Sequence, residues 1–490
     1  MNFKIIWRFH GWVLLLEAVF LLPAIGISLL DGTQKVTISF LIALAAMLLS
    51  ATVLLVLSRR APKDFYAREG FFCVASSWIL LSLFGCLPFC ISGEIPNFID
   101  ALFEMVSGFT TTGASIVPDV EQLSRAILYW RSFSHWVGGM GVLVFLLAVA
   151  PAGGKGNGFT MHLFRAESPG PEVGKLVPKI RQTAALLYGT YVALTIINFL
   201  FLFLGGMPLF DSVCTAFGTA GTGGFGIKAD SLAGYSTYIQ VVCTVFMLLF
   251  SINFSCYYLI LMKQIRSVLR DEELRLFGAI VVGSILLITW NIYDLYGSFW
   301  EALHHSSFQV ASIISTSGFS STDFDLWPSF SKAILLLLMT TGACAGSTCG
   351  GMKCARVLLL FKGVRRNVSQ LLHPQRVQPV RVNGRAVDER TMANTNAYLS
   401  AYALILVASF LLVSLDGFTV ITNFSAVMTC FNNVGPGFDL VGPMRNFALY
   451  SPLSKLVLIF DMLAGRLEIF PILVLFSGIV RRRTDTGGSI

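Results

Sequence analysis

The sequence predicts an all-α, polytopic membrane protein built from four pseudo-symmetric repeats. The first observation behind this prediction is composition. Of 490 residues, 55% are hydrophobic and 13% are charged, about half the charged share of an ordinary soluble domain. The second is a short polar stretch containing glycine that recurs four times, each time after an apolar segment too short to cross a bilayer.

Residues 1–60 are expected to form a leading transmembrane hairpin. Its apolar runs, residues 11–30 and 36–57, are each about 20 residues long, which is enough to span a bilayer. The first run alone has the character of a signal peptide, but the second follows at once, which favours a retained hairpin.

Four repeats are predicted to follow, at residues 61–160, 161–270, 271–375 and 376–490. Each contains a span, a half-helix, a glycine loop and a second span. The first spans are expected at 71–91, 183–204, 276–296 and 396–415, and the half-helices at 98–109, 209–218, 299–314 and 420–431. The second spans are expected at 126–150, 238–262, 332–361 and 453–480. The total is ten transmembrane helices plus four re-entrant pore helices.

Lysine and arginine set the predicted orientation. They gather in residues 59–68, 155–181, 263–275, 362–390 and 481–483, all on one side of the predicted spans. The positive-inside rule makes this side cytoplasmic, together with both termini. The same distribution explains the net charge of +8 without nucleic-acid binding.

The glycine loops are expected to line one pore. Irregular backbone at membrane depth cannot face lipid, because its polar groups would lack partners. Glycine accepts a positive φ, which turns carbonyls inward to replace the water around a cation, and the C-terminal end of each half-helix adds partial negative charge. The glycines predicted to occupy equivalent positions in the four loops are Gly113, Gly223, Gly318 and Gly435. The full set of predicted filter residues is Thr111, Thr112, Gly113, Thr222, Gly223, Thr316, Ser317, Gly318, Asn433, Val434 and Gly435. The alternative is four unrelated tight turns.

A glycine-rich stretch, residues 340–351, interrupts the second span of the third repeat. Glycine costs about 1 kcal/mol at a helical position, so this density predicts a broken helix lying across the conduction path below the filter. The residues concerned are Gly342, Gly346, Ser347, Thr348, Gly350, Gly351 and Lys353. A small-residue helix contact is the alternative.

Arg466 lies inside an apolar span, where a charge is costly and suggests function. It is expected to face the pore below the filter as an electrostatic barrier. An ion pair with Asp461 or Glu468 is the alternative, and both roles are compatible.

Together these stretches resemble the Trk/Ktr/HKT superfamily of potassium transporters, closest to its bacterial Trk-type membrane subunit. The resemblance covers nearly the whole chain. It rests on the four glycine loops, the glycine-rich break, the leading hairpin, residues 251–254 (Ser-Ile-Asn-Phe) and residues 463–470 (Leu-Ala-Gly-Arg-Leu-Glu-Ile-Phe). The chain departs from the family pattern at Gly221, where a hydroxyl residue is more typical.

The resemblance implies potassium uptake, with potassium bound at the filter residues and the glycine-rich break acting as an intramembrane gating loop. It also implies a location in a bacterial inner membrane and a homodimer in membrane lipid, controlled by a cytoplasmic ring of nucleotide-binding (TrkA-like) subunits. This chain itself has no nucleotide-binding signature. In this family, glycine at all four filter positions accompanies a preference for potassium, so Gly113 implies that preference here.

Two other functions are considered. An intramembrane enzyme would need paired acid–base or metal groups, but neither the histidines nor the ten cysteines have such spacing. An osmosensing receptor that has lost transport would not need four filter glycines. The sequence leaves open whether uptake is passive or a symport with protons or sodium.

Overall fold

The computed structural model describes residues 3–59, 67–141, 180–375 and 378–480, and these are mostly helical. Within these ranges, six helices are long and apolar enough to cross a membrane, or seven if one bent pair counts as a single span. A single two-stranded hairpin is described, β1 (Arg381–Val382) with β2 (Arg385–Ala386).

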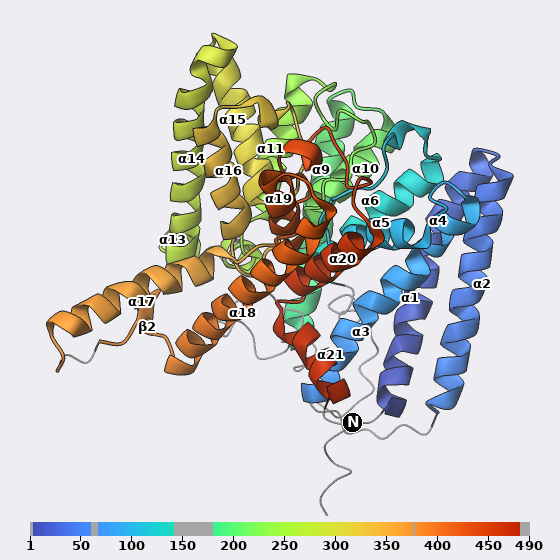
Figure 1. The fold of residues 1–490 in the computed structure, drawn as a ribbon, viewed down its shortest axis with the longest axis horizontal. Helices are drawn as coiled ribbons and strands as arrows, with labels where there is room; N and C mark the ends of the chain where they lie inside the picture. Colours follow the sequence, from blue (N-terminus) through green and yellow to red (C-terminus); the bar gives the residue numbers. More distant parts are fainter. Residues whose placement is uncertain (1–2, 60–66, 142–179, 376–377, 481–490) are drawn as a thin grey trace, which may run out of the picture.

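The leading hairpin consists of α1 (Phe3–Leu30) and α2 (Gln34–Leu57), joined by a turn in which Gly32 has a φ of 69°. The two helices lie side by side at one edge of the molecule (Figure 1). One face of α1 packs against α3 and α6, while outward residues such as Leu49 of α2 remain exposed, as expected of a lipid-facing surface.

Each repeat begins with a long apolar helix. In the first repeat this helix is interrupted at Cys86, where α3 (Ala67–Gly85) gives way to α4 (Leu87–Ser92) with Pro88 in its first turn. The corresponding helices of the later repeats are α9 (Ile180–Leu204), α14 (Glu272–Tyr296) and α18 (Glu389–Val413).

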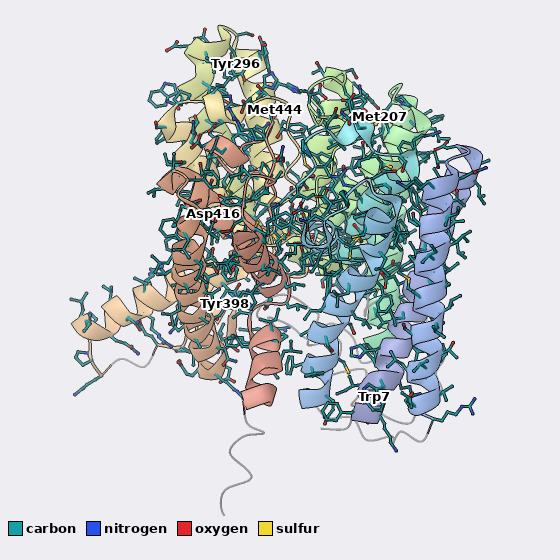
Figure 2. All side chains as sticks on the ribbon, turned by 45° about the vertical axis from the view of Figure 1, so that its right-hand side comes forward. Trp7, Met207, Tyr296, Tyr398, Asp416 and Met444 are labelled. Carbon is teal, nitrogen blue, oxygen red and sulfur yellow. The ribbon has the colours of Figure 1, made fainter. Side chains whose placement is uncertain are left out.

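Four shorter helices follow, and they match the predicted half-helices closely. They are α5 (Phe98–Phe109), α10 (Leu209–Gly221), α15 (Phe299–Ile314) and α19 (Val420–Phe431). Acids in the first turn of α5, α10 and α15 suit the positive end of the helix dipole. Figure 2 places Met207 and Tyr296, which precede α10 and α15, at the end of the molecule opposite Trp7 of α1. The half-helices of the second and third repeats therefore start from the side opposite the N-terminus.

The second helices differ from the prediction, because each is broken or ends early. The described pieces are α6 (Arg125–Gly139), α11 (Thr237–Phe250) with α12 (Phe254–Leu261), α16 (Ser329–Thr341) with α17 (Cys354–Leu372), and α20 (Pro452–Arg466) with α21 (Phe470–Val480). Only the third break was expected. Continuous spans over 238–262 and 453–480 are wrong, and α6 stops at Gly139, while residues 142–150 lie outside the described ranges.

Local causes of these breaks are visible. Asn253 caps α12 by accepting a hydrogen bond from Ser255 N at 2.9 Å, and α11 and α12 meet at 88°. In the fourth repeat, Glu468 and Ile469 have φ values of 58° and 63°, which an α-helix does not accommodate.

The segment at 362–390, predicted as a basic loop, is largely structured. Helix α17 continues through Leu372 and projects from the bundle, and the β1–β2 hairpin follows it (Figure 1). Asn383 of this hairpin donates to Asp271 Oδ2 at 2.8 Å, and Lys362 pairs with Glu272, so both elements are fastened to the start of α14.

Candidate ion-conduction site

The loops after the four half-helices share one backbone conformation. The first residue of each has a φ close to 55°: Thr111 at 55°, Thr222 at 56°, Thr316 at 56° and Asn433 at 54°. Two residues later comes a glycine, again with positive φ: Gly113 at 79°, Gly224 at 73°, Gly318 at 74° and Gly435 at 103°. We call residues 111–113, 222–224, 316–318 and 433–435 the filter loops. A left-handed conformation at non-glycine residues is uncommon, so four repetitions identify a true structural repeat.

Hydrogen bonds fix the same register. The amides of Thr112, Gly223, Ser317 and Val434 donate to carbonyls five residues earlier, each at 2.9 Å. Gly224, not Gly223, is therefore the equivalent of Gly113, and the predicted alignment of the second loop is wrong by one residue. Gly223 occupies the middle position instead.

The four loops close into a ring. A Cβ placed on the third residue of each loop would collide with the middle carbonyl of the next loop. The distances are 1.9 Å from Gly113 to Gly223 O, 1.8 Å from Gly224 to Ser317 O, 2.3 Å from Gly318 to Val434 O and 2.7 Å from Gly435 to Thr112 O. Because the fourth loop returns to the first, the loops surround one axis. Four unrelated turns would not produce this order.

All seven non-glycine residues proposed for the filter are fully buried, namely Thr111, Thr112, Thr222, Thr316, Ser317, Asn433 and Val434. Gly113, Gly224 and Gly318 retain partial exposure. Each loop also lies at the C-terminal end of its half-helix, where the helix dipole is partially negative. The ring thus combines converging backbone with an electrostatic preference for cations.

Side chains break the fourfold symmetry. Hydroxyl pairs join Thr110 to Thr112 and Ser315 to Ser317, each at 2.8 Å, whereas the second loop has Gly221 and Gly223 at these positions. A Cβ on Gly221 would lie 2.2 Å from His135 O of α6. The close approach of α6 therefore explains the glycine that departs from the family pattern.

The predicted helix break below the filter is present. Residues 342–353, the gate segment, connect α16 to α17 without helical structure, and Gly342, Gly346, Gly351 and Lys353 have φ values of 64°, 72°, 75° and 72°. A small-residue contact between intact helices does not fit this backbone.

The gate segment touches the filter directly. Gly350 N donates to Thr316 Oγ1 at 2.7 Å, and a Cβ on Gly350 would lie 2.5 Å from Asn432 O. Ser347 and Thr348 are buried, and Lys353 donates a hydrogen bond to Cys349 O within the segment. Among the predicted gating residues, Gly350 thus lies next to the third and fourth filter loops.

The helix breaks of the second and third repeats are hydrogen-bonded to each other. Cys344 N donates to Ser251 O at 3.2 Å, and Phe254 N donates to Gly346 O at 3.1 Å. Ala345 N donates to Glu273 Oε1 of α14 at 2.6 Å. The α11–α12 bend thereby satisfies backbone groups that the unwound gate segment would otherwise leave without partners.

Arg466 joins the gate segment to α6. Its guanidinium donates to Thr348 O at 2.8 Å, to Gly138 O at 2.5 Å and to Gly139 O at 2.8 Å. Of the two acids considered as its partners, Glu468 pairs with Arg356 at 2.5 Å and Asp461 accepts from Ser409 Oγ at 2.6 Å.

A buried ion pair behind the first filter loop was not foreseen. Arg131 of α6 pairs with Glu104 of α5 at 2.6 Å, and Glu104 also accepts from Ser115 Oγ and Ile116 N, each at 2.9 Å. The carboxylate thus fastens the chain leaving the first loop. A charged residue in each of two apolar segments was the available signal.

Asp439 follows the fourth filter loop by four residues. It accepts from Thr419 Oγ1 and Thr422 Oγ1, each at 2.7 Å. These two hydrogen bonds hold the pKa of Asp439 below its ordinary value. The carboxylate therefore remains charged at neutral pH.

Comparison with known proteins agrees with this architecture. The sequence pattern of the family described as TrkH, cation transport protein, matches residues 36–296 and 298–482. The chain belongs to the TrkH family. The crystal structure of the potassium transporter TrkH from Vibrio parahaemolyticus is similar, with a TM-score of 0.86, 34% sequence identity, and coverage of 97% of this chain and 98% of that chain.

TrkH-family relatives extend the match. The Trk system potassium uptake protein TrkH of Salmonella typhimurium is 37% identical over 488 residues, covering 97% of this chain and 99% of the relative. The Trk system potassium uptake protein TrkG of Escherichia coli is 38% identical over 424 residues, covering 85% and 86%. The resemblance inferred from sequence is confirmed, and it places the chain in a family of transport proteins.

Proposed function

We propose that this chain is the membrane subunit of a Trk-type potassium uptake system and that potassium crosses through the ring of filter loops. The observation that carries the proposal is the closed sequence of contacts between the third residue of each loop and the middle carbonyl of the next. The printed names of the relatives, which are potassium uptake proteins, support the choice of ion.

In this proposal potassium is the transported substrate, coordinated by backbone carbonyls of the filter loops. The half-helix dipoles lower the energy of a dehydrated cation at the centre of the ring. Each loop has one glycine at its third position, so the coordinating stack is short and discrimination among monovalent cations is expected to be modest. Coupling to protons or sodium is not part of the proposal.

The gate segment is proposed to restrict conduction from below, with Arg466 as an electrostatic barrier. Two hydrogen bonds support this role. Arg466 donates to Thr348 O of the gate segment, and Gly350 N of the gate segment donates to Thr316 Oγ1 of the third filter loop. The surrounding architecture is proposed to have ten spans with both termini cytoplasmic in an inner membrane.

Partners follow from the same proposal. The relatives are named as proteins of a Trk system, which supports control by a separate cytoplasmic, nucleotide-binding subunit. The basic segments 155–181 and 362–390 are the proposed docking sites for an acidic face of this subunit, and residues 155–179 lie outside the described ranges. A homodimer is also proposed. It is supported by an exposed apolar face on α17, where Phe361 and Leu371 are 68% and 82% exposed.

The test is potassium-dependent growth of an uptake-deficient bacterial host, followed by rubidium uptake into liposomes that contain the purified chain. Growth rescue together with rubidium uptake supports transport. A folded chain that binds its partners but carries no ion in either assay would instead support the receptor hypothesis. Co-purification from native membranes tests for the soluble subunit, and mass measurement in detergent tests for the dimer.

A further inference from the structure

His135 of α6 belongs to the first repeat but contacts the filter loop of the second. Its side chain is fully buried. Nδ1 lies 2.8 Å from Gly108 O at the end of α5, and Nε2 accepts a hydrogen bond from Phe225 N at 3.3 Å. Phe225 directly follows the second filter loop, so one imidazole joins the end of the first half-helix to the residue after the second filter loop.

These two hydrogen-bond partners determine the protonation state of the His135 imidazole. Gly108 O can only accept, so Nδ1 must carry the proton, and Phe225 N–H can only donate, so Nε2 must offer a lone pair. The neutral imidazole with its proton on Nδ1 satisfies both, and any other protonation state would lose at least one of them.

The second loop has fewer side chains than the other three. Gly221, Gly223 and Gly224 leave Thr222 as its one side chain, whereas hydroxyl pairs restrain the first and third loops. A Cβ added to Gly223 would lie 2.2 Å from Nδ1 and 2.3 Å from Cγ of His135. The imidazole therefore occupies the space that the side chains of Thr112 and Ser317 fill in their own loops.

The phenyl ring of Phe225 completes the contact. It lies 4.3 Å from the His135 ring, centroid to centroid, and the Arg131 guanidinium lies over it at 4.2 Å. Two residues one helical turn apart on α6 thus hold the residue that follows the loop, and Glu104 holds Arg131 in turn.

We propose that His135 is a positioning residue for ion selectivity: it replaces the missing side chain of Gly223 and keeps the Gly223 carbonyl in the filter ring. This inference rests on the proposed function. It assigns a side chain of the first repeat to the selectivity of the second loop, the most glycine-rich of the four.

The test measures the potassium-to-sodium permeability ratio from bi-ionic reversal potentials, using the full chain in planar bilayers. His135→Ala should lower the ratio about fivefold, which corresponds to about 1 kcal/mol. His135→Asn keeps a donor near Gly108 and loses the acceptor for Phe225, so it should lower the ratio less. His10→Ala is the matched control, because His10 of α1 contacts Ser76 of α3, away from the filter loops, and its loss should leave the ratio unchanged.

Combining substitutions at Gly223 and His135 distinguishes a positioning role of His135 from a purely structural role. Gly223→Ser alone should lower the ratio, because its Cβ overlaps the imidazole. The double variant His135→Ala, Gly223→Ser should recover at least half of the loss, because the new side chain fills the vacated space, as Ser317 does in the third loop. A merely structural histidine would give losses that add.

The outcomes are distinct. A parent chain without potassium conductance refutes the proposed function, and this inference falls with it. A selective parent whose His135→Ala variant keeps the parental ratio overturns the inference alone, as does a double variant no better than the worse single. If His135→Ala is not recovered in folded form, the inference is tested by His135→Asn and by the comparison of Gly223→Ser with the double variant.

Discussion

Serine substitution of the four filter glycines should reduce selectivity in a graded order. Each glycine has a positive φ, which costs an L-residue about 1–2 kcal/mol. Each new Cβ also meets a carbonyl oxygen of the next loop, at 1.8 Å for Gly224, 1.9 Å for Gly113, 2.3 Å for Gly318 and 2.7 Å for Gly435. To reach a 3.0 Å separation, the atoms must move apart by 1.1 Å at Gly113 and by 0.3 Å at Gly435.

These displacements fall on the carbonyls that are proposed to coordinate the ion. A tenfold loss of discrimination needs about 1.4 kcal/mol, within the roughly 1–3 kcal/mol stored in one strained backbone position. Gly113→Ser and Gly224→Ser should therefore lower the potassium-to-sodium ratio about tenfold or more. Gly318→Ser should have an intermediate effect and Gly435→Ser the smallest, and conduction should persist.

Bi-ionic reversal potentials give the ratio directly. Gly278→Ser is the control, because a Cβ on this α14 glycine would meet nothing within 4 Å. An unchanged ratio in a well-expressed Gly113→Ser or Gly224→Ser variant would show that these residues do not shape the filter. A loss at Gly435 as large as that at Gly113 would refute the steric ranking.

The remaining predictions concern the gate segment and Asp439, which follows the fourth filter loop. Arg466→Ala, or deletion of residues 346–350, should raise rubidium flux into liposomes, because each removes a barrier below the filter; folded variants with parental flux would count against the gating role. Asp439→Asn should slow uptake at low potassium and low ionic strength, since the lost charge attracts cations. Because the lowered pKa of Asp439 keeps it ionised at neutral pH, this difference should vanish only as pH falls through that pKa in acid. Thr316→Val removes the acceptor for Gly350 N, a bond worth about 1 kcal/mol, and should raise the open probability in single-channel recordings. An open probability equal to that of the parent would show that this bond does not hold the gate.

Sequence reasoning located the half-helices well because local signals bound them. Three of the four match the structure at both ends, where polar caps precede an apolar run and the filter loop follows it. The second helices were harder. The break after Phe250 has no glycine, and its backbone groups find partners in Gly346 and Cys344, about 90 residues away in the chain. That compensation is tertiary and leaves no local pattern.

The register of the second filter loop shows the same limit. Gly223 and Gly224 are adjacent, and each is glycine for its own reason. Gly224 has the positive φ of the repeat, whereas Gly223 makes room for the His135 ring. The sequence shows two glycines but not which constraint acts on which residue, because one of the constraints comes from α6.

The filter loops and the gate segment are hydrogen-bonded to each other, and this limits how independently they can move. Gly350 N holds Thr316 Oγ1 in the third loop, and Asn433 Nδ2 in the fourth loop donates both to Thr112 Oγ1 at 3.0 Å and to Met462 O of α20 at 2.9 Å. A displaced gate segment therefore acts on a filter side chain directly. Arg466 differs, since its bonds to Thr348 and to the end of α6 go to carbonyls outside the filter loops. Thr316→Val should thus change flux and selectivity together, whereas Arg466→Ala should change flux with little effect on selectivity.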